Sequence, residues 1–135
     1  MRVIIQRSKN SSVTINNKIH GSIQFGYVLL VGFTDGDNEQ VIDKIINKVL
    51  NLRIFEDENG KMNQSLIDVG GSILSISQFT LYADTKKGNR PSFINSLEYN
   101  KASELYDYFN LKLKERGIEV ETGIFIFRHN SRYKT

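Results

Sequence analysis

The most constraining feature of this sequence is an apolar run, Tyr27–Val31, which lies between Gly26 and Gly32. Apolar and polar residues alternate along a strand that has one solvated face, and this run does not alternate. It is therefore typical of a central β-strand that is buried on both faces. A strand of this kind requires a helix packed against its sheet.

Two segments show the apolar periodicity of such helices. Apolar residues recur every 3.6 residues between Asn38 and Leu52, and Asp37 or Asn38 is placed to cap the start. A second stripe runs from about Asn100 to Arg116, with Gly117 as its stop. Its members are Ala102, Leu105, Tyr106, Phe109 and Leu113. The sequence thus predicts two main helices.

Several other segments have strand character and are separated by residues that favour turns. They are Val3–Arg7, Ser12–Ile15, Gly26–Phe33, Gly71–Tyr82 and Glu119–Phe125, with turns at Asn16–Asn17, His20–Gly21 and Glu58–Gly60. This order of elements predicts the α+β class: a single domain over residues 1–135, in which a mixed or antiparallel β-sheet packs with two main helices.

Composition narrows the function classes. With 135 residues, 39% of them hydrophobic, the chain can form one core, and no apolar run approaches the roughly 20 residues of a membrane span. The apolar start Val3–Ile5 is too short for a signal peptide, so a cytoplasmic protein is expected. With no cysteine and two histidines, neither a metal nor a cofactor is expected. The net charge of +3 is compatible with a polyanionic partner.

The segment Ser77–Thr80 is the first candidate site. Gln78 and Thr80 would share one face of a strand, while Ser77 and Phe79 would share the other. In one interpretation the alternating Ser and Thr side chains simply face water. In the other, the end of the strand and its backbone amides form a site. No histidine stands near in the sequence as a general base, so a Ser-His-Asp triad is not expected.

The second candidate is a basic loop. Lys86, Lys87 and Arg90 form the densest basic cluster in the chain, and Gly88 would let backbone amides approach a phosphate closely. The loop would then contact RNA, or it is a solvated tip with no such role. Arg7 is either a surface residue or a group that fixes a backbone feature through its guanidinium.

A longer pattern joins these candidates. Ser77–Asp84, followed by Lys87–Phe93, resembles the signature of the D-aminoacyl-tRNA deacylases, enzymes that remove D-amino acids from mischarged tRNA. The resemblance covers roughly residues 1 to 125, because other segments match in the same order. These are Val3–Arg7, Leu29–Gly32, Leu52–Phe55, Asn59–Asn63 and Thr122–Phe125.

The resemblance implies a homodimer with a site at each subunit interface, which receives the 3′-terminal adenosine of tRNA and its amino acid. It places the catalytic segment at Ser77, Gln78, Phe79 and Thr80. It offers Thr80 as a nucleophile in one view, but favours the view that the 2′-hydroxyl of the substrate assists hydrolysis while these residues position the ester. It also implies that Phe125 lines the adenosine side and that Arg7 holds the element that reads chirality.

The C-terminal part departs from the family pattern from about residue 126. The family carries an Asn-x-Gly-Pro-Val-Thr motif that excludes L-amino acids, and its position here would lie beyond Thr135. His129 stands where the family usually has methionine. Without the motif's strand, an exposed sheet edge and a missing chirality filter are expected. Two functions stay open: a D-aminoacyl-tRNA deacylase, with activity that is either intact or impaired, and a non-catalytic dimeric remnant that binds tRNA ends.

Overall fold

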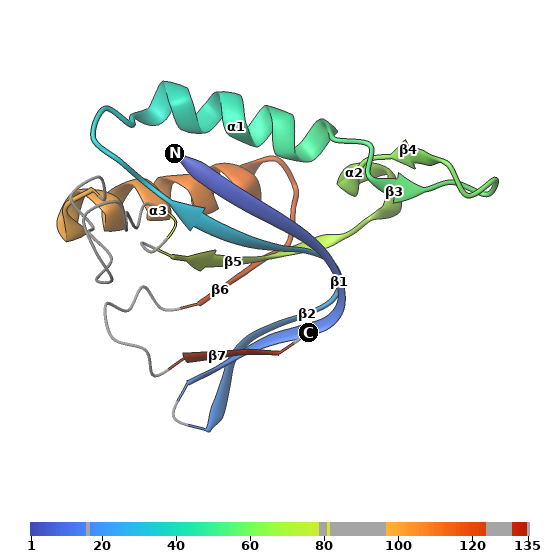
Figure 1. Ribbon diagram of the computed structural model, residues 1–135, viewed down its shortest axis with the longest axis horizontal. Coiled ribbons are helices and arrows are strands. Elements are labelled where there is room, and N and C mark those ends of the chain that lie inside the picture. The colour runs from blue at the N-terminus through green and yellow to red at the C-terminus, as the bar shows by residue number, and fades with distance from the viewer. Residues whose placement is uncertain (16, 79–80, 82–96, 124–130, 135) are drawn as a thin grey trace, which may run out of the picture.

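The computed structural model describes residues 1–15, 17–78, 81, 97–123 and 131–134. Its five-stranded sheet has the strand order β6-β5-β2-β1-β7 (Figure 1). β2 (Lys18–Gly32) runs parallel to β5 (Ser72–Ser77), which runs parallel to β6 (Val120–Thr122). β1 (Arg2–Ile15) is antiparallel to β2 and to β7 (Ser131–Lys134). The predicted α+β class with a mixed sheet is confirmed.

β1 and β2 form one long hairpin. Its turn is at the predicted place, where Asn17 has a positive φ of 65°. The predicted turn at His20–Gly21 is wrong, because both residues lie within β2 and Gly21 pairs with Val13 of β1. Likewise, β1 is one strand instead of the two that were expected. In both cases pairing with the neighbouring strand supplies the backbone hydrogen bonds, so residue types that favour turns do not end the strand.

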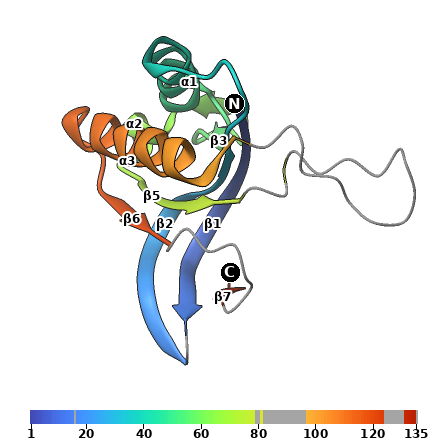
Figure 2. The ribbon, with the colours of Figure 1, turned by 90° about the vertical axis from the view of Figure 1, so that its left-hand side faces the viewer.

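The hairpin bends near Gly26. This glycine has a φ of 144°, and a Cβ placed on it would lie 1.8 Å from the carbonyl oxygen of Ser72. Glycine is therefore required for the close approach of β2 to the start of β5. Beyond the bend the hairpin curves away from the helices (Figure 2).

Two helices lie on one side of the sheet. α1 (Glu39–Asn51) begins at the predicted cap, since the side chain of Asn38 accepts a hydrogen bond of 3.0 Å from the amide of Val41. α3 (Tyr99–Glu115) ends before Gly117, which has a φ of 84°. Of its predicted stripe, Leu105 is half-buried and the other four members are buried. Both main helices are confirmed.

Smaller elements connect α1 to β5. β3 (Phe55–Glu56) and β4 (Met62–Gln64) form a hairpin with Gly60 in the predicted turn. The carboxylate of Asp57 accepts hydrogen bonds from the side chain of Asn63 and from nearby backbone amides, and these lower the pKa of Asp57. The single-turn helix α2 (Leu66–Val69) was not predicted.

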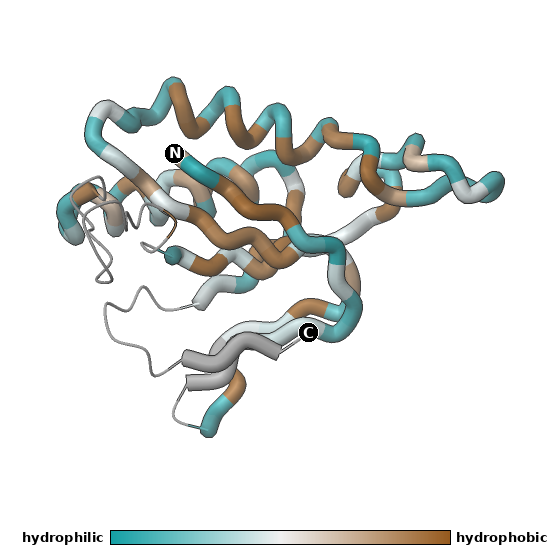
Figure 3. Tube along the Cα trace, in the orientation of Figure 1, coloured by the Kyte–Doolittle hydropathy of each residue, from teal (hydrophilic) through white to brown (hydrophobic). Residues whose placement is uncertain are grey.

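The core has two parts. The larger lies between the sheet and the helices and includes Tyr27, Leu29 and Val31, as predicted for a central strand. The smaller, formed by Ile23, Val28, Leu74 and Ile76, shows that the same strands are also apolar on their other side. Figure 3 shows hydrophobic stretches along the strands beneath the helices. None of the described helices is long and apolar enough to cross a membrane.

Candidate active site

The candidate site begins where β5 ends. The strand was expected to continue to Tyr82, but it ends at Ser77, because the carbonyl of Gln78 turns back to accept a 3.4 Å hydrogen bond from the amide of Leu81. The amide of Gln78 donates to the carbonyl of Val31 at 2.7 Å. Arg2 donates to the carbonyl of Leu81 at 2.6 Å. The segment after β5 is thus tied to the end of β2 and the start of β1.

Ser75 and Ser77 do not face water, so the interpretation of a solvated row of hydroxyls is wrong for both. Their exposed fractions are 0% and 6%, because they share a face of β5 with Ile73, which belongs to the larger core between the sheet and the helices. Neither hydroxyl has a hydrogen-bond partner within the described part of the chain. A buried polar group without a partner costs about 1–3 kcal/mol.

Tyr106 of α3 fixes the strands next to this segment. Its buried hydroxyl donates to the carbonyl of Ser75 at 2.6 Å and lies 3.3 Å from the carbonyl of Gly123. The amide of Gly123 in turn donates to the carbonyl of Ser75 at 2.9 Å. One side chain therefore joins the end of β6 to β5, two residues before Ser77. Sequence reasoning placed Tyr106 in the apolar stripe and missed this contact, because helical periodicity does not indicate where a hydroxyl points.

Arg7 lies apart from Ser77 within one chain. Arg7 pairs with Tyr27, whereas Ser77 pairs with Val31, four residues further along β2. Strand geometry then separates them by about 13 Å along the strands and about 10 Å across them, or about 16 Å in all. The guanidinium of Arg7 donates to the carbonyl of Ile54 at 3.0 Å. As one interpretation of the sequence predicted, Arg7 therefore fixes a backbone group, the carbonyl of Ile54 just before β3.

Tyr27, opposite Arg7, carries a buried hydroxyl without a partner among the described residues. Burial raises the pKa of Tyr27, and the charge of Arg7 partly offsets that rise. The phenol is therefore neutral at physiological pH and does not serve as a base there.

The remaining predicted site residues lie outside the described residues. They are Phe79 and Thr80 of the catalytic segment, Lys86, Lys87 and Arg90 of the basic loop, and Phe125. The residues that the structure does describe contain no group of three or more acidic or histidine side chains that could hold a metal ion.

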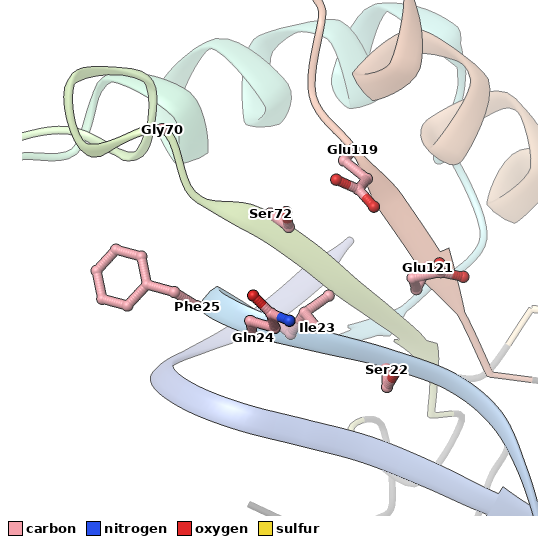
Figure 4. A pocket seen from close by; sticks show the side chains of 8 residues that line it. All are labelled: Ser22, Ile23, Gln24, Phe25, Gly70, Ser72, Glu119 and Glu121. Carbon is pink, nitrogen blue, oxygen red and sulfur yellow. The ribbon is translucent and has the colours of Figure 1, made fainter.

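The largest described hollow lies elsewhere. It has a volume of about 500 Å³ and opens at the start of β5 and β6, at the other end of these strands from Ser77. Glu121 of β6 and Glu119, just before that strand, line one side of the hollow. Gln24 of β2 lines another side (Figure 4). Two carboxylates repel a phosphate, so this hollow does not suit a nucleic acid.

The described fold and site define a single α+β unit with a buried, unpartnered serine at the carboxyl end of parallel strands. Comparison with known proteins identifies the family. The family model described as D-Tyr-tRNA(Tyr) deacylase matches residues 4–132. This match continues past residue 125, into the segment that was expected to be atypical. The chain belongs to the D-Tyr-tRNA(Tyr) deacylase family.

Individual relatives agree with this assignment. The D-aminoacyl-tRNA deacylase of Bacillus cytotoxicus is 56% identical over 125 residues, which are 93% of this chain and 86% of the relative. The enzyme of the same name from Anoxybacillus flavithermus is 54% identical with the same coverage.

Solved structures share the fold. The c-Myc DNA Unwinding Element Binding Protein superposes with a TM-score of 0.89 at 31% identity, over 98% of this chain and 89% of that one. A probable eukaryotic D-amino acid tRNA deacylase superposes with a TM-score of 0.78 at 20% identity, over 98% and 92%. At this lower identity the likeness concerns the fold alone.

Proposed function

We propose that this chain hydrolyses the ester bond of D-aminoacyl-tRNA and releases free tRNA and the D-amino acid. The observation that carries the proposal is the family match over residues 4–132, together with relatives named D-aminoacyl-tRNA deacylase at 54–56% identity. We assign the reaction to the buried end of β5.

In the proposed reaction, water attacks the ester carbonyl carbon. A carbon–oxygen bond forms to water, the bond to the ribose oxygen breaks, and the ribose oxygen takes up a proton. The 2′-hydroxyl of the terminal adenosine assists this transfer, while Ser77, Gln78, Phe79 and Thr80 position the ester. The amide of Gln78 donates to the carbonyl of Val31, so it is not assigned to the oxyanion.

The hydroxyl of Ser77 supports this assignment. It is buried and has no partner within the described residues, which is costly unless a ligand supplies one. A substrate oxygen or amino group can do so. Ser77 thus acts as a positioning donor or acceptor and not as a nucleophile.

The proposal includes a homodimer. Arg7 is about 16 Å from Ser77 by strand geometry, which is longer than an arginine side chain. Arg7 can therefore contribute to a site near Ser77 only from a second copy of the chain. Phe125 is assigned to the adenosine side of that site, and the basic loop Lys86, Lys87 and Arg90 to the tRNA backbone. We place the protein in the cytoplasm, where its tRNA substrate is.

Hydrolysis of D-tyrosyl-tRNA by the wild type, Ser77→Ala and Ser72→Ala tests the proposal. Both serines belong to β5, but Ser72 lies at the far end of the strand. Losing one hydrogen bond to the substrate lowers kcat/KM about tenfold, so we expect this for Ser77→Ala and no change for Ser72→Ala. Tight tRNA binding without turnover would instead support a non-catalytic tRNA-binding protein.

A further inference from the structure

A second, smaller hollow lies where β1 and β2 pass β3. It has a volume of about 260 Å³ and is lined by Arg7, Ser8, Lys9, Phe25 and Phe55. We call it the basic hollow. Arg7 and Lys9 are two residues apart on one strand and so project from the same face. Lys9 pairs with Phe25 of β2, so the two side chains are neighbours on that face.

Within the described residues, no acidic group neutralises the positive charge of the basic hollow. Arg7 and Lys9 are both exposed, and neither forms an ion pair with another described residue. No carboxylate lines the hollow, in contrast to the two other described hollows, which contain Glu119 and Glu121 or Asp43 and Glu115. Two unpaired cations around a concave surface attract an anion.

Aromatic rings form the other wall. Phe25 and Phe55 have ring centroids 5.3 Å apart, and Phe55 stacks on Tyr27 at 5.2 Å with an interplanar angle of 17°. Phe55 is 5% exposed and Tyr27 is fully buried, so the rings beneath Phe25 are fixed in the core. Phe25 itself is half-buried and leaves part of its ring accessible. A partly accessible aromatic ring on a rigid support is a suitable platform for a nucleobase.

We infer that the basic hollow binds one nucleotide of the single-stranded 3′ end of tRNA. Arg7 and Lys9 hold its phosphate, and its base stacks on Phe25. The guanidinium of Arg7 is positioned for this by its hydrogen bond to Ile54, which leaves further N–H groups for the phosphate. The identity of the nucleic acid rests on the proposed function, whereas the preference for an anion with a flat ring follows from the lining residues.

Binding of fluorescently labelled, deacylated tRNA at several KCl concentrations tests this site. Each phosphate contact on a single strand contributes about 0.7 to the slope of log K against log salt. Lys9→Gln is therefore expected to reduce the slope by about 0.7 and to weaken binding about fivefold at low salt. Lys44→Gln is the matched control, because Lys44 is an exposed lysine on α1 that lines none of the described hollows. Equal slopes for the two variants would overturn the phosphate contact.

Phe25→Leu tests the stacking contact separately. It keeps an apolar side chain against Phe55 but removes the ring, so we expect at least about a fivefold loss of affinity with an unchanged salt slope. Wild-type affinity in a variant with a wild-type melting curve would overturn the stacking contact. If Phe25→Leu melts below the assay temperature, the Lys9→Gln slope decides alone.

The tRNA-binding measurement does not depend on catalysis. Deacylated tRNA carries no ester, so its binding to the basic hollow is measured whether or not the chain hydrolyses D-aminoacyl-tRNA. Failure of hydrolysis with an intact Lys9 effect would reject the proposed function only. Hydrolysis with equal slopes for the two lysine variants would reject the basic hollow only.

Discussion

Tyr106→Phe removes a hydroxyl that joins α3 to the ends of both β5 and β6. The phenol oxygen lies 2.6 Å from the carbonyl of Ser75 and 3.3 Å from that of Gly123, in a side chain that is only 5% exposed. The carbonyl of Ser75 keeps a second donor, the amide of Gly123 at 2.9 Å. We therefore expect a loss near the middle of the usual range, about 1 kcal/mol of unfolding free energy.

For a chain of this size that loss lowers the melting temperature by about 3–5 °C. The effect on activity is expected to be larger than the effect on stability suggests. Ser77 and the segment after it follow directly from the strand that Tyr106 holds, and small displacements of positioning groups can reduce the rate up to about 100-fold. We expect kcat for D-tyrosyl-tRNA to fall about tenfold with little change in KM, because tRNA affinity comes mainly from phosphate contacts elsewhere.

Tyr108→Phe is the matched control on the same helix. Its hydroxyl bonds to Asp43 of α1 at 2.9 Å on the exposed side of the helix pair. This substitution should leave kcat unchanged and should alter stability by less than about 0.5 kcal/mol. Equal kcat values for Tyr106→Phe and the wild type, measured below the melting transition of both, would refute the positioning role of Tyr106.

Three further outcomes follow from the site. Ser77→Ala should leave the melting temperature unchanged or raise it, because it removes a buried hydroxyl that has no partner among the described residues, and thermal unfolding checks this. Thr80→Ala should lower kcat by about 10- to 100-fold, not the 10⁴-fold or more expected for a nucleophile, and tRNA ending in 2′-deoxyadenosine should be hydrolysed poorly in single-turnover assays. Replacing Lys86, Lys87 and Arg90 together by alanine should make the salt dependence of tRNA binding shallower while the melting temperature stays within a few degrees; an unchanged slope would identify the loop as a solvated tip.

Local sequence patterns were sufficient to predict the elements that depend on neighbouring residues in the chain. The 3.6-residue period with Asn38 as cap determined α1, and Gly117 marked the end of α3. The apolar run Tyr27–Val31 indicated a central strand, because burial on both faces leaves a direct signature in composition.

Features that depend on pairing between strands could not be predicted from local sequence patterns. His20–Gly21 has the composition of a turn but pairs with β1, and Ser75 and Ser77 have polar side chains on the face of β5 that packs into the larger core. The separation of Arg7 from Ser77 depends on strand register, which residue types alone do not fix. The hydroxyl contact of Tyr106 and the rings of the basic hollow depend on three-dimensional contacts between distant segments.

Single-turnover hydrolysis with excess protein tests the central claim most directly. D-tyrosyl-tRNA and L-tyrosyl-tRNA are each incubated with one preparation, and free tRNA and released tyrosine are measured against a buffer control. The account predicts that D-tyrosyl-tRNA is hydrolysed well above the uncatalysed rate, with equal amounts of free tRNA and D-tyrosine formed. Decay of D-tyrosyl-tRNA at the rate of the buffer control, in a preparation that is folded and binds tRNA, would contradict it.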